Sequence, residues 1–395
     1  MDPSHTETPL LPAEFADIAP YTEDNYFPHL VRLTKEPGFE HAVRFIMPNV
    51  DYDAFCSELL SVKSQEDFQR RIMGRFLSDL ERLGTAGVTA DGIENISAET
   101  PYTFISNHRD IVLDPAFLNL VMLRNSLPVT QIAIGNNLLI YDWITDLVKI
   151  NRSFIVKRDV KKLEALDAAR HLSAYIHFAI MKLHESVWIA QRQGRAKDSD
   201  DVTQESLVKM LSIAGESGDR KSNLMELNLL PVSISYEFDP NDYLKVREFV
   251  MRRRDPEFKK SQRDDLFSME TGMTGYKGRV HYHFAGCVNQ QLAAISTTNR
   301  NEAVHSACMA IDKEIHSGYY LYPINFIAAD IVENTDKYRA RYTDDDIATA
   351  KAYMDRQLAK VDLPDITPEE HDYMRMMFLT MYANPVRNKE AALQK

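Results

Sequence analysis

Apolar residues recur at helical spacing near the start of the chain. Between residues 25 and 83 they fall about three or four positions apart, as Val43, Ile46 and Met47 do, which predicts three or four helices. Two short apolar runs follow, at 93–97 and 102–105, and the second ends in Ser106-Asn107-His108. β-branched and aromatic residues dominate this second run, so the pattern predicts two short strands.

The middle of the chain alternates between strand-like and helix-like segments. The predicted strands are 130–134, 154–156, 187–190, 229–236 and an edge strand at 280–284. The predicted helices are 115–124, 138–148, 159–185 with Asp159 as N-cap, 302–316, 344–358 and 368–381. This alternation predicts an α/β fold, in which helices flank a central, mostly parallel mixed sheet. A helical layer precedes that sheet and a helical extension follows it.

The same pattern divides the chain into regions. We expect a disordered N-terminus (1–20), an N-terminal helical region (21–84), an α/β domain (85–295), a C-terminal helical extension (296–384) and a flexible tail (385–395). The first twenty residues lack the basic and apolar regions of a secretory signal. The longest segment without charged residues, 280–299, is too polar for a membrane span.

Charge and cysteine content narrow the function classes. The 395 residues include 46 basic and 58 acidic side chains, a net charge of −12, and 44% are hydrophobic. A nucleic-acid partner is not expected, because phosphate backbones are bound by clustered basic residues. The three cysteines, Cys56, Cys287 and Cys308, are widely separated, which favours free thiols in the reducing cytoplasm over disulfides.

Polar residues follow several of the predicted strands. His108, Lys157, Arg158, Arg195 and Lys197 all come after predicted strands. In open α/β sheets, ligands bind at the carboxyl ends of strands, so these side chains are expected to share one edge. A histidine can accept a proton at neutral pH, and a nearby carboxylate can orient it. The combination indicates a base that acts on an anionic substrate.

Four segments resemble, in order, the motifs of the glycerol-3-phosphate/lysophosphatidate acyltransferase family, and of its larger glycerol-3-phosphate type in particular. They are Asn107-His108 with Asp114, Phe154-Ile155-Val156-Lys157-Arg158, Gln193-Gly194-Arg195-Ala196-Lys197, and Leu230-Pro231-Val232-Ser233-Ile234. Gly278 to Phe284 is similar to the strand that follows in the larger type. The resemblance covers about residues 85 to 290.

The chain departs from the family pattern at two places. The family has four residues between His and Asp, whereas five separate His108 from Asp114. Either Asp114 or Asp110 is therefore the partner of His108, and Pro115 favours Asp114, at or near the N-cap of the next helix. Gln193 stands where the family has glutamate, so a negative charge is missing.

The resemblance implies transfer of a fatty acyl group from acyl-CoA or acyl carrier protein to the hydroxyl of glycerol 3-phosphate or a related lipid precursor. It implies His108 as general base with Asp114 or Asp110, and no metal or redox cofactor. The substrate-binding residues it implies, with Pro231 on the acyl wall, are Arg109, Lys157, Arg158, Gly194, Arg195, Lys197 and Pro231. Lysophosphatidate or an amino-acid lipid as acceptor, lipid or acyl-donor binding without catalysis, and thioester hydrolysis remain alternatives.

The segment Lys245–Arg263 carries an unusual local charge. It holds eight basic residues and three acidic ones. Such a patch can dock an acidic carrier protein, coenzyme A phosphates or anionic lipid headgroups. We therefore expect a cytoplasmic protein that associates peripherally with the cytoplasmic membrane face through this segment.

Overall fold

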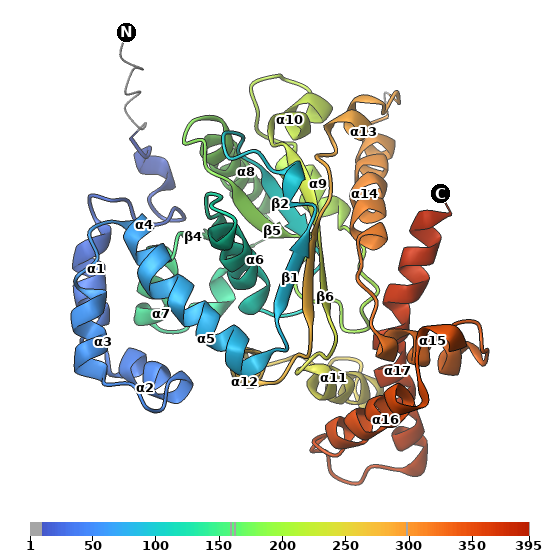
Figure 1. The fold of residues 1–395 in the computed structure, drawn as a ribbon. Coiled ribbons are helices and arrows are strands. Elements are labelled where there is room, and N and C mark those ends of the chain that lie inside the picture. The colour runs from blue at the N-terminus through green and yellow to red at the C-terminus, as the bar shows by residue number, and fades with distance from the viewer. Residues whose placement is uncertain (1–9, 159, 162, 298, 395) are drawn as a thin grey trace.

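The computed structural model describes residues 10–158, 160–161, 163–297 and 299–394. Within these residues, seven strands form one sheet in the order β1-β7-β6-β2-β5-β3-β4 (Figure 1). The strands are β1 (Val88–Asp91), β2 (Thr103–Ser106), β3 (Gln131–Gly135), β4 (Ser153–Val156), β5 (Val187–Ala190), β6 (Leu229–Tyr236) and β7 (Val280–Phe284). The β6–β7 pair is antiparallel and the other neighbours are parallel. The predicted mostly parallel mixed sheet is confirmed.

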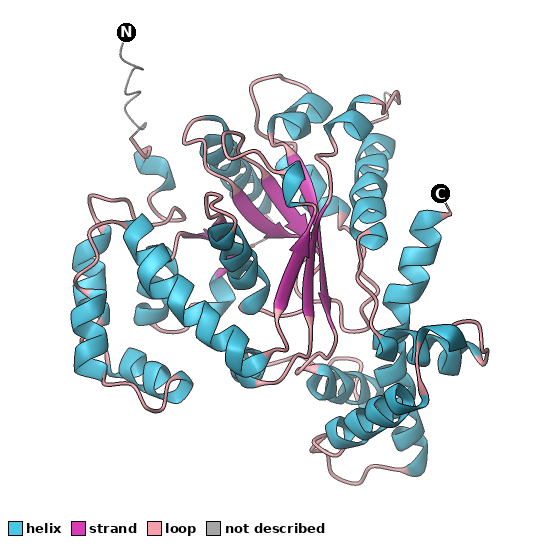
Figure 2. Ribbon diagram, viewed as in Figure 1, coloured by secondary structure: helices cyan, strands magenta, loops and turns pink. Residues whose placement is uncertain are grey.

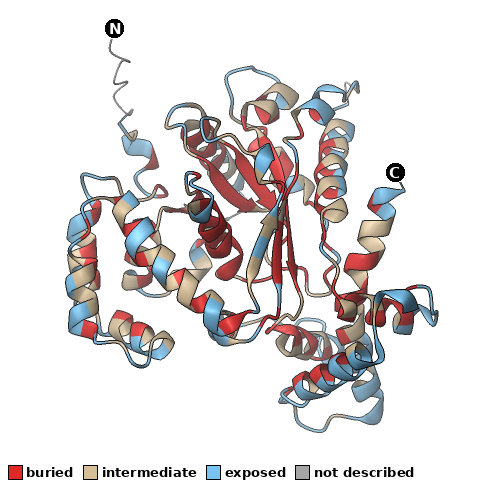
Figure 3. Ribbon diagram, in the orientation of Figure 1, coloured by how far each residue is buried: buried red, intermediate tan, exposed pale blue. Residues whose placement is uncertain are grey.

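Helices cover both faces of the sheet (Figure 2). Neighbouring residues on β2 separate to opposite faces: Ile105 joins one apolar core and Phe104 joins the other. The helices of the first core are α8 (Ala165–Met181), α9 (Glu205–Leu211), α10 (Arg220–Glu226), α13 (Asn289–Ala293) and α14 (Arg300–Ser317). The second core contains α5 (Gly74–Gly84) and α6 (Leu113–Arg124). Strands β2 and β6, at the centre of the sheet, and helix α6 are deeply buried, whereas the edge strand β1 is partly exposed (Figure 3).

The N-terminal helices form a layer with its own apolar core. They are α1 (Tyr26–Leu33), α2 (Pro37–Ile46), α3 (Tyr52–Leu59) and α4 (Gln65–Asp67), and a π-helical turn at Phe68–Met73 joins α4 to α5. Their core also contains Ile150, the last residue of α7 (Asp142–Ile150), which attaches the layer to the sheet domain. The N-terminal helical region of the prediction is thus packed against the α/β domain.

The C-terminal helices form a further apolar core. They are α15 (Pro323–Glu333), α16 (Asp344–Leu358) and α17 (Pro368–Leu393), and they pack with α11 (Asp242–Arg254). The remaining helix, α12 (Gln262–Thr274), lies beside α5. In the described ranges, no helix combines the length and the apolar character that crossing a bilayer demands.

Three predictions about elements were wrong. The segment 93–97 is no strand: Gly92 has a φ of +72° and ends β1, and a 3-10 turn follows at Ile93–Asn95. Strand β7 is internal, because β1 pairs on its outer side. The helix expected at 159–185 begins only at Ala165, and Leu163 is 94% exposed. The proposed N-cap, Asp159, lies outside the described residues.

Both expected flexible ends contain packed residues. Phe15 and Ile18 are buried in the core around α8, and the Ile18 carbonyl accepts a hydrogen bond of 2.9 Å from the Ile155 amide. Helix α17 continues through Pro385 to Leu393, with Val386 buried. A few isolated apolar residues, such as Phe15 and Val386, pack into the core and hold these segments in place. Because they form no periodic apolar face, the sequence pattern does not reveal them.

Candidate active site

His108 and Asp114 form a hydrogen-bonded pair just beyond the carboxyl end of β2. His108 Nδ1 lies 2.8 Å from Asp114 Oδ2. The same carboxylate oxygen accepts the backbone N–H groups of Arg109, at 2.6 Å, and Asp110, at 3.0 Å. Asp114 is fully buried, whereas the His108 side chain keeps 12% of its surface exposed. The turn therefore folds around a fixed carboxylate and leaves the far edge of the imidazole accessible.

Asp110 has a different role in the same turn. Its Oδ1 accepts the backbone N–H groups of Val112, at 2.9 Å, and Leu113, at 2.8 Å, and so caps the start of α6. Asp114 lies in the first turn of α6, two positions after the N-cap Val112, in agreement with the expectation that it is at or near the N-cap. Burial, then the charge of Asp114, raises the pKa of Asp110. Of the two carboxylates, Asp114 is the one that contacts His108.

Neighbouring strands hold the His108 turn. The Asn107 side chain bonds both backbone groups of Ile234 on β6, accepting from its N–H at 2.8 Å and donating to its carbonyl at 2.9 Å. On the other side, the Trp188 ring of β5 lies edge-on to His108, with 5.7 Å between ring centroids. Asn107 therefore attaches the turn to the sheet, and the Trp188 ring packs against one side of the His108 imidazole.

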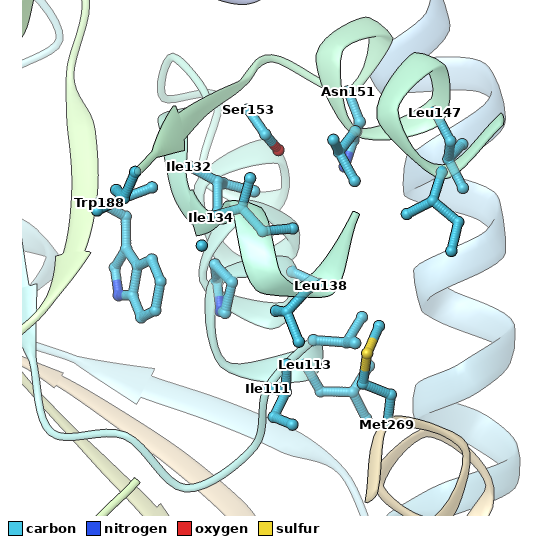
Figure 4. Close-up of a pocket in the computed structure, with 18 of the residues that line it drawn as sticks. Ile111, Leu113, Ile132, Ile134, Leu138, Leu147, Asn151, Ser153, Trp188 and Met269 are labelled. Carbon is cyan, nitrogen blue, oxygen red and sulfur yellow. The ribbon is translucent and has the colours of Figure 1, made fainter. Parts of the chain in front are cut away.

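His108 lines a cavity of about 1270 Å³. This volume exceeds the roughly 300 to 1,000 Å³ of common small-molecule pockets. Figure 4 shows part of its wall, which includes Ile132 and Ile134 of β3, Leu147 of α7 and Met269 of α12. Helices α2, α3 and α5 complete the wall with apolar side chains. The cavity thus lies between the N-terminal layer and the sheet and suits a long apolar group.

Among the described residues, three lysine and arginine side chains line the cavity at the carboxyl ends of β4 and β5. Lys157 and Arg158 follow β4, as predicted; Lys157 Nζ lies 2.6 Å from Asp17, and the Arg158 amide donates to Asn136 Oδ1 at 2.8 Å. Sequence reasoning missed the third, Arg192. Its side chain has no hydrogen bond or ion pair to another described residue, and its Nε is buried. Its position two residues after β5 was the available signal.

The third predicted motif contributes Gln193 to the cavity but not its other residues. Gly194 has a φ of +71°, and no atom lies within 4 Å of the place that a Cβ would take. Arg195 is 6% exposed and does not line the cavity. We name as the inner charged cluster the residues Asp110, Arg195, Lys197, Asp239, Lys245, Glu248 and Lys277. The predicted cations Arg195 and Lys197 belong to this cluster, apart from the cations of the cavity.

Buried opposite charges hold the inner charged cluster together. Lys197 Nζ lies 3.2 Å from Glu248 Oε2, and Lys245 pairs with Asp239. Burial, then the neighbouring charge of Arg195, lowers the pKa of Lys197 to about 7. Burial lowers the pKa of Lys277 to about 8. Gly272 of α12 lets this helix approach the cluster, because a Cβ there would lie 2.0 Å from Asp110 Oδ2.

Two further predicted substrate contacts lie elsewhere. The Arg109 guanidinium is buried and pairs with Asp201 at 2.7 Å, so it is occupied within the protein. Pro231 lies inside β6, opposite Ile105 of β2, and does not line the cavity. The apolar wall of the cavity comes instead from β3, α7, α12 and the N-terminal helices, whose docking depends on contacts between distant segments.

Intramolecular contacts occupy much of the basic segment Lys245–Arg263. Lys245 is 1% exposed, and Lys260 and Arg252 both pair with Glu248. Arg254 pairs with Glu370 at 2.7 Å, and Arg253 lies over the Tyr373 ring. Through Arg253 and Arg254, at the end of α11, the segment packs against helix α17. Lys245 is therefore no part of an exposed docking patch.

Comparisons with known proteins give a distant structural similarity. No family model matches the sequence, and no curated protein matches it. Among solved structures, the chain is similar to the crystal structure of the 1-acyl-sn-glycerophosphate (LPA) acyltransferase, PlsC, from Thermotoga maritima. The similarity covers 72% of this chain and 94% of that chain, at 10% identity and a TM-score of 0.35.

Proposed function

We propose that the protein transfers a fatty acyl group from a thioester, acyl-CoA or acyl carrier protein, to a hydroxyl of glycerol 3-phosphate or a related lipid precursor. The observation that carries the proposal is the His108–Asp114 pair on the wall of a large apolar cavity. The cavity accommodates the acyl chain, and the imidazole lies where the chain meets the charged edge of the sheet.

The contact between His108 and Asp114 supports the following proton path. Asp114 accepts a hydrogen bond from Nδ1 of His108, so the neutral imidazole carries its proton on Nδ1. The other ring nitrogen, Nε2, is then able to accept a proton. Nε2 takes the proton of the acceptor hydroxyl as its oxygen attacks the thioester carbonyl carbon. The tetrahedral intermediate then breaks its C–S bond, and the thiolate takes the proton back from the imidazolium. An ester and a free thiol result, and Asp114 stabilises the transient charge on His108.

The cations of the cavity are suited to the anionic groups of both substrates. Arginine offers a planar fork of donors that matches a phosphate. Arg192 has no partner among the described residues, so it is the group we assign to the acceptor phosphate. Lys157 and Arg158 lie along the same edge and are assigned to the phosphates of the acyl donor.

A second candidate function is acyl-donor binding without transfer, and Gln193 is the observation that favours it. Its side chain lines the cavity where the resembling family has a glutamate, so the site lacks one negative charge. The two candidates differ in turnover, not in binding.

Transfer of labelled acyl groups tests the proposal. Purified protein is given acyl-CoA or acyl carrier protein with glycerol 3-phosphate, lysophosphatidate or a crude lipid extract. We expect a product with wild type, none with His108→Ala, and unchanged product with His305→Ala, which removes an exposed histidine of α14. Binding of the donor without any product would favour the second candidate, and release of free fatty acid without an acceptor would indicate hydrolysis.

A further inference from the structure

The wall of the apolar cavity contains two polar side chains away from the charged edge. Ser153, the first residue of β4, is 3% exposed, and its hydroxyl points into the cavity beside Asn151 (Figure 4). Asn151 Oδ1 accepts a hydrogen bond of 2.8 Å from Gln69 Nε2, which turns its Nδ2 donors away from Gln69. Neither the Ser153 hydroxyl nor Asn151 Nδ2 bonds any described residue. Both residues line the cavity, so these two groups can bond to an oxygen atom of a molecule that occupies it.

The sheet register locates this pair relative to His108. Trp188 of β5, which contacts the His108 ring, pairs with Ile132 of β3, and Ile132 pairs with Ser153 of β4. All three side chains line the cavity. At about 4.8 Å between strands, Ser153 lies about 10 Å across the sheet from Trp188. The pair is therefore well removed from the carbonyl carbon that His108 would act on.

The polar pair is also distant from the cations. Lys157 follows Ser153 by four positions along β4, a separation of about 13 Å at the strand rise. Phosphates of a donor or an acceptor belong at the Lys157 end. The surroundings of Ser153, such as Ile132 and Leu147, are apolar, as a hydrocarbon chain requires.

We propose that Ser153 and Asn151 form a subsite for an oxygen atom partway along the acyl chain, and that the preferred acyl group carries a hydroxyl or keto group there. This inference rests on the proposed use of the cavity for an acyl chain. Asn151 Nδ2 donates to the chain oxygen, and the Ser153 hydroxyl donates to it or accepts from a chain hydroxyl. A saturated chain leaves both side chains unpaired.

Equilibrium binding tests this without turnover. A fluorescent fatty acid bound to the full chain is displaced by stearate, by stearate hydroxylated mid-chain, or by stearate hydroxylated beside the carboxyl group. We expect wild type to bind the mid-chain derivative about fivefold more tightly than stearate. Ser153→Ala should abolish this preference, while Ser206→Ala, which alters another serine of the cavity wall, should retain it.

The outcomes distinguish the oxygen subsite from the proposed use of the cavity for an acyl chain. Equal affinity of wild type for stearate and its mid-chain derivative would overturn the subsite while leaving the acyl cavity in place. A preference for the derivative hydroxylated beside the carboxyl group would also overturn it. If no fatty acid displaces the probe, the cavity is not an acyl site and both proposals fail. Selective binding in a protein without transferase activity would support the subsite alone.

Discussion

Arg109 and Asp201 form a buried ion pair that links the His108 turn to the loop after β5. The Arg109 amide donates to Asp114, and its guanidinium lies 2.7 Å from Asp201. Asp201 also accepts a hydrogen bond of 2.7 Å from the Tyr319 hydroxyl, and Arg109 lies over the Tyr319 ring. Arg109 thus couples the position of His108 to the loop after β5 and to the segment after α14.

Replacement of Asp201 by asparagine should destabilise the protein strongly. Arg109 would keep a buried charge without a counter-charge, which costs about 3 to 5 kcal/mol. The free energy of unfolding in urea measures the effect. The double variant Arg109→Met with Asp201→Asn should recover part of the loss. Glu40→Gln, which breaks the exposed Arg44–Glu40 pair, should cost about 0.5 kcal/mol or less; a similar loss in both single variants would refute the role of burial.

The two carboxylates near His108 should differ in their effect on catalysis. Asp114→Asn should lower kcat about 10²- to 10⁴-fold, because the imidazolium loses its counter-charge. Asp110→Asn should leave kcat within about tenfold, since the amide oxygen can still cap α6. Steady-state rates with saturating substrates decide between them. A larger loss with Asp110→Asn than with Asp114→Asn would contradict the assigned pairing.

Arg192→Ala should weaken binding of the phosphorylated acceptor. Loss of a charge-assisted contact predicts a rise of about tenfold or more in KM, with little change in kcat or in the unfolding midpoint. Arg195→Ala should instead lower stability, because Arg195 is buried and its charge, after that of Lys245, lowers the pKa of Asp239. Kinetics and urea unfolding of both variants separate the effects. An unchanged KM in Arg192→Ala would exclude it from the phosphate site.

Lys277 should make the protein more stable as the pH rises above 8. Its folded pKa is about 8, below the value of 10.5 for a free lysine. Between these values the unfolded chain binds the extra proton, so the free energy of unfolding increases with pH. Urea unfolding at pH 8 and pH 10 should show a smaller increase in Lys277→Met than in wild type. Equal increases would mean that Lys277 keeps its proton in the folded state.

Local patterns were enough to predict most of the sheet and the contact between His108 and Asp114. The apolar runs around Phe104 and Leu230 form strands that are buried on both faces. The bounds of both strands lie close to those that the pattern predicts. His108 and Asp114 are close in sequence, so their contact depends on a single turn. These features require little knowledge of distant packing.

Contacts between distant segments could not be predicted in this way. Whether a cation after a strand faces the cavity or the inner charged cluster depends on α11 and α12, which follow much later in the chain. Arg195 and Lys197 were therefore assigned to the substrate, and Arg192 was overlooked. The cavity wall likewise depends on how α2 and α3 dock against β3. Spacing along the sequence contains no information on that docking.

The pairing of β1 with β7 limits the order in which the sheet can form during synthesis. Among the described residues β1 pairs with β7 alone, through matches such as Val88 with Val280. During synthesis β1 leaves the ribosome long before its partner exists, so its backbone groups must wait in water or pair wrongly. Contacts of such large sequence separation also slow folding. We expect the edge of the sheet to close last, only after β7 has been translated, and nascent chains that stop before it to be prone to aggregation.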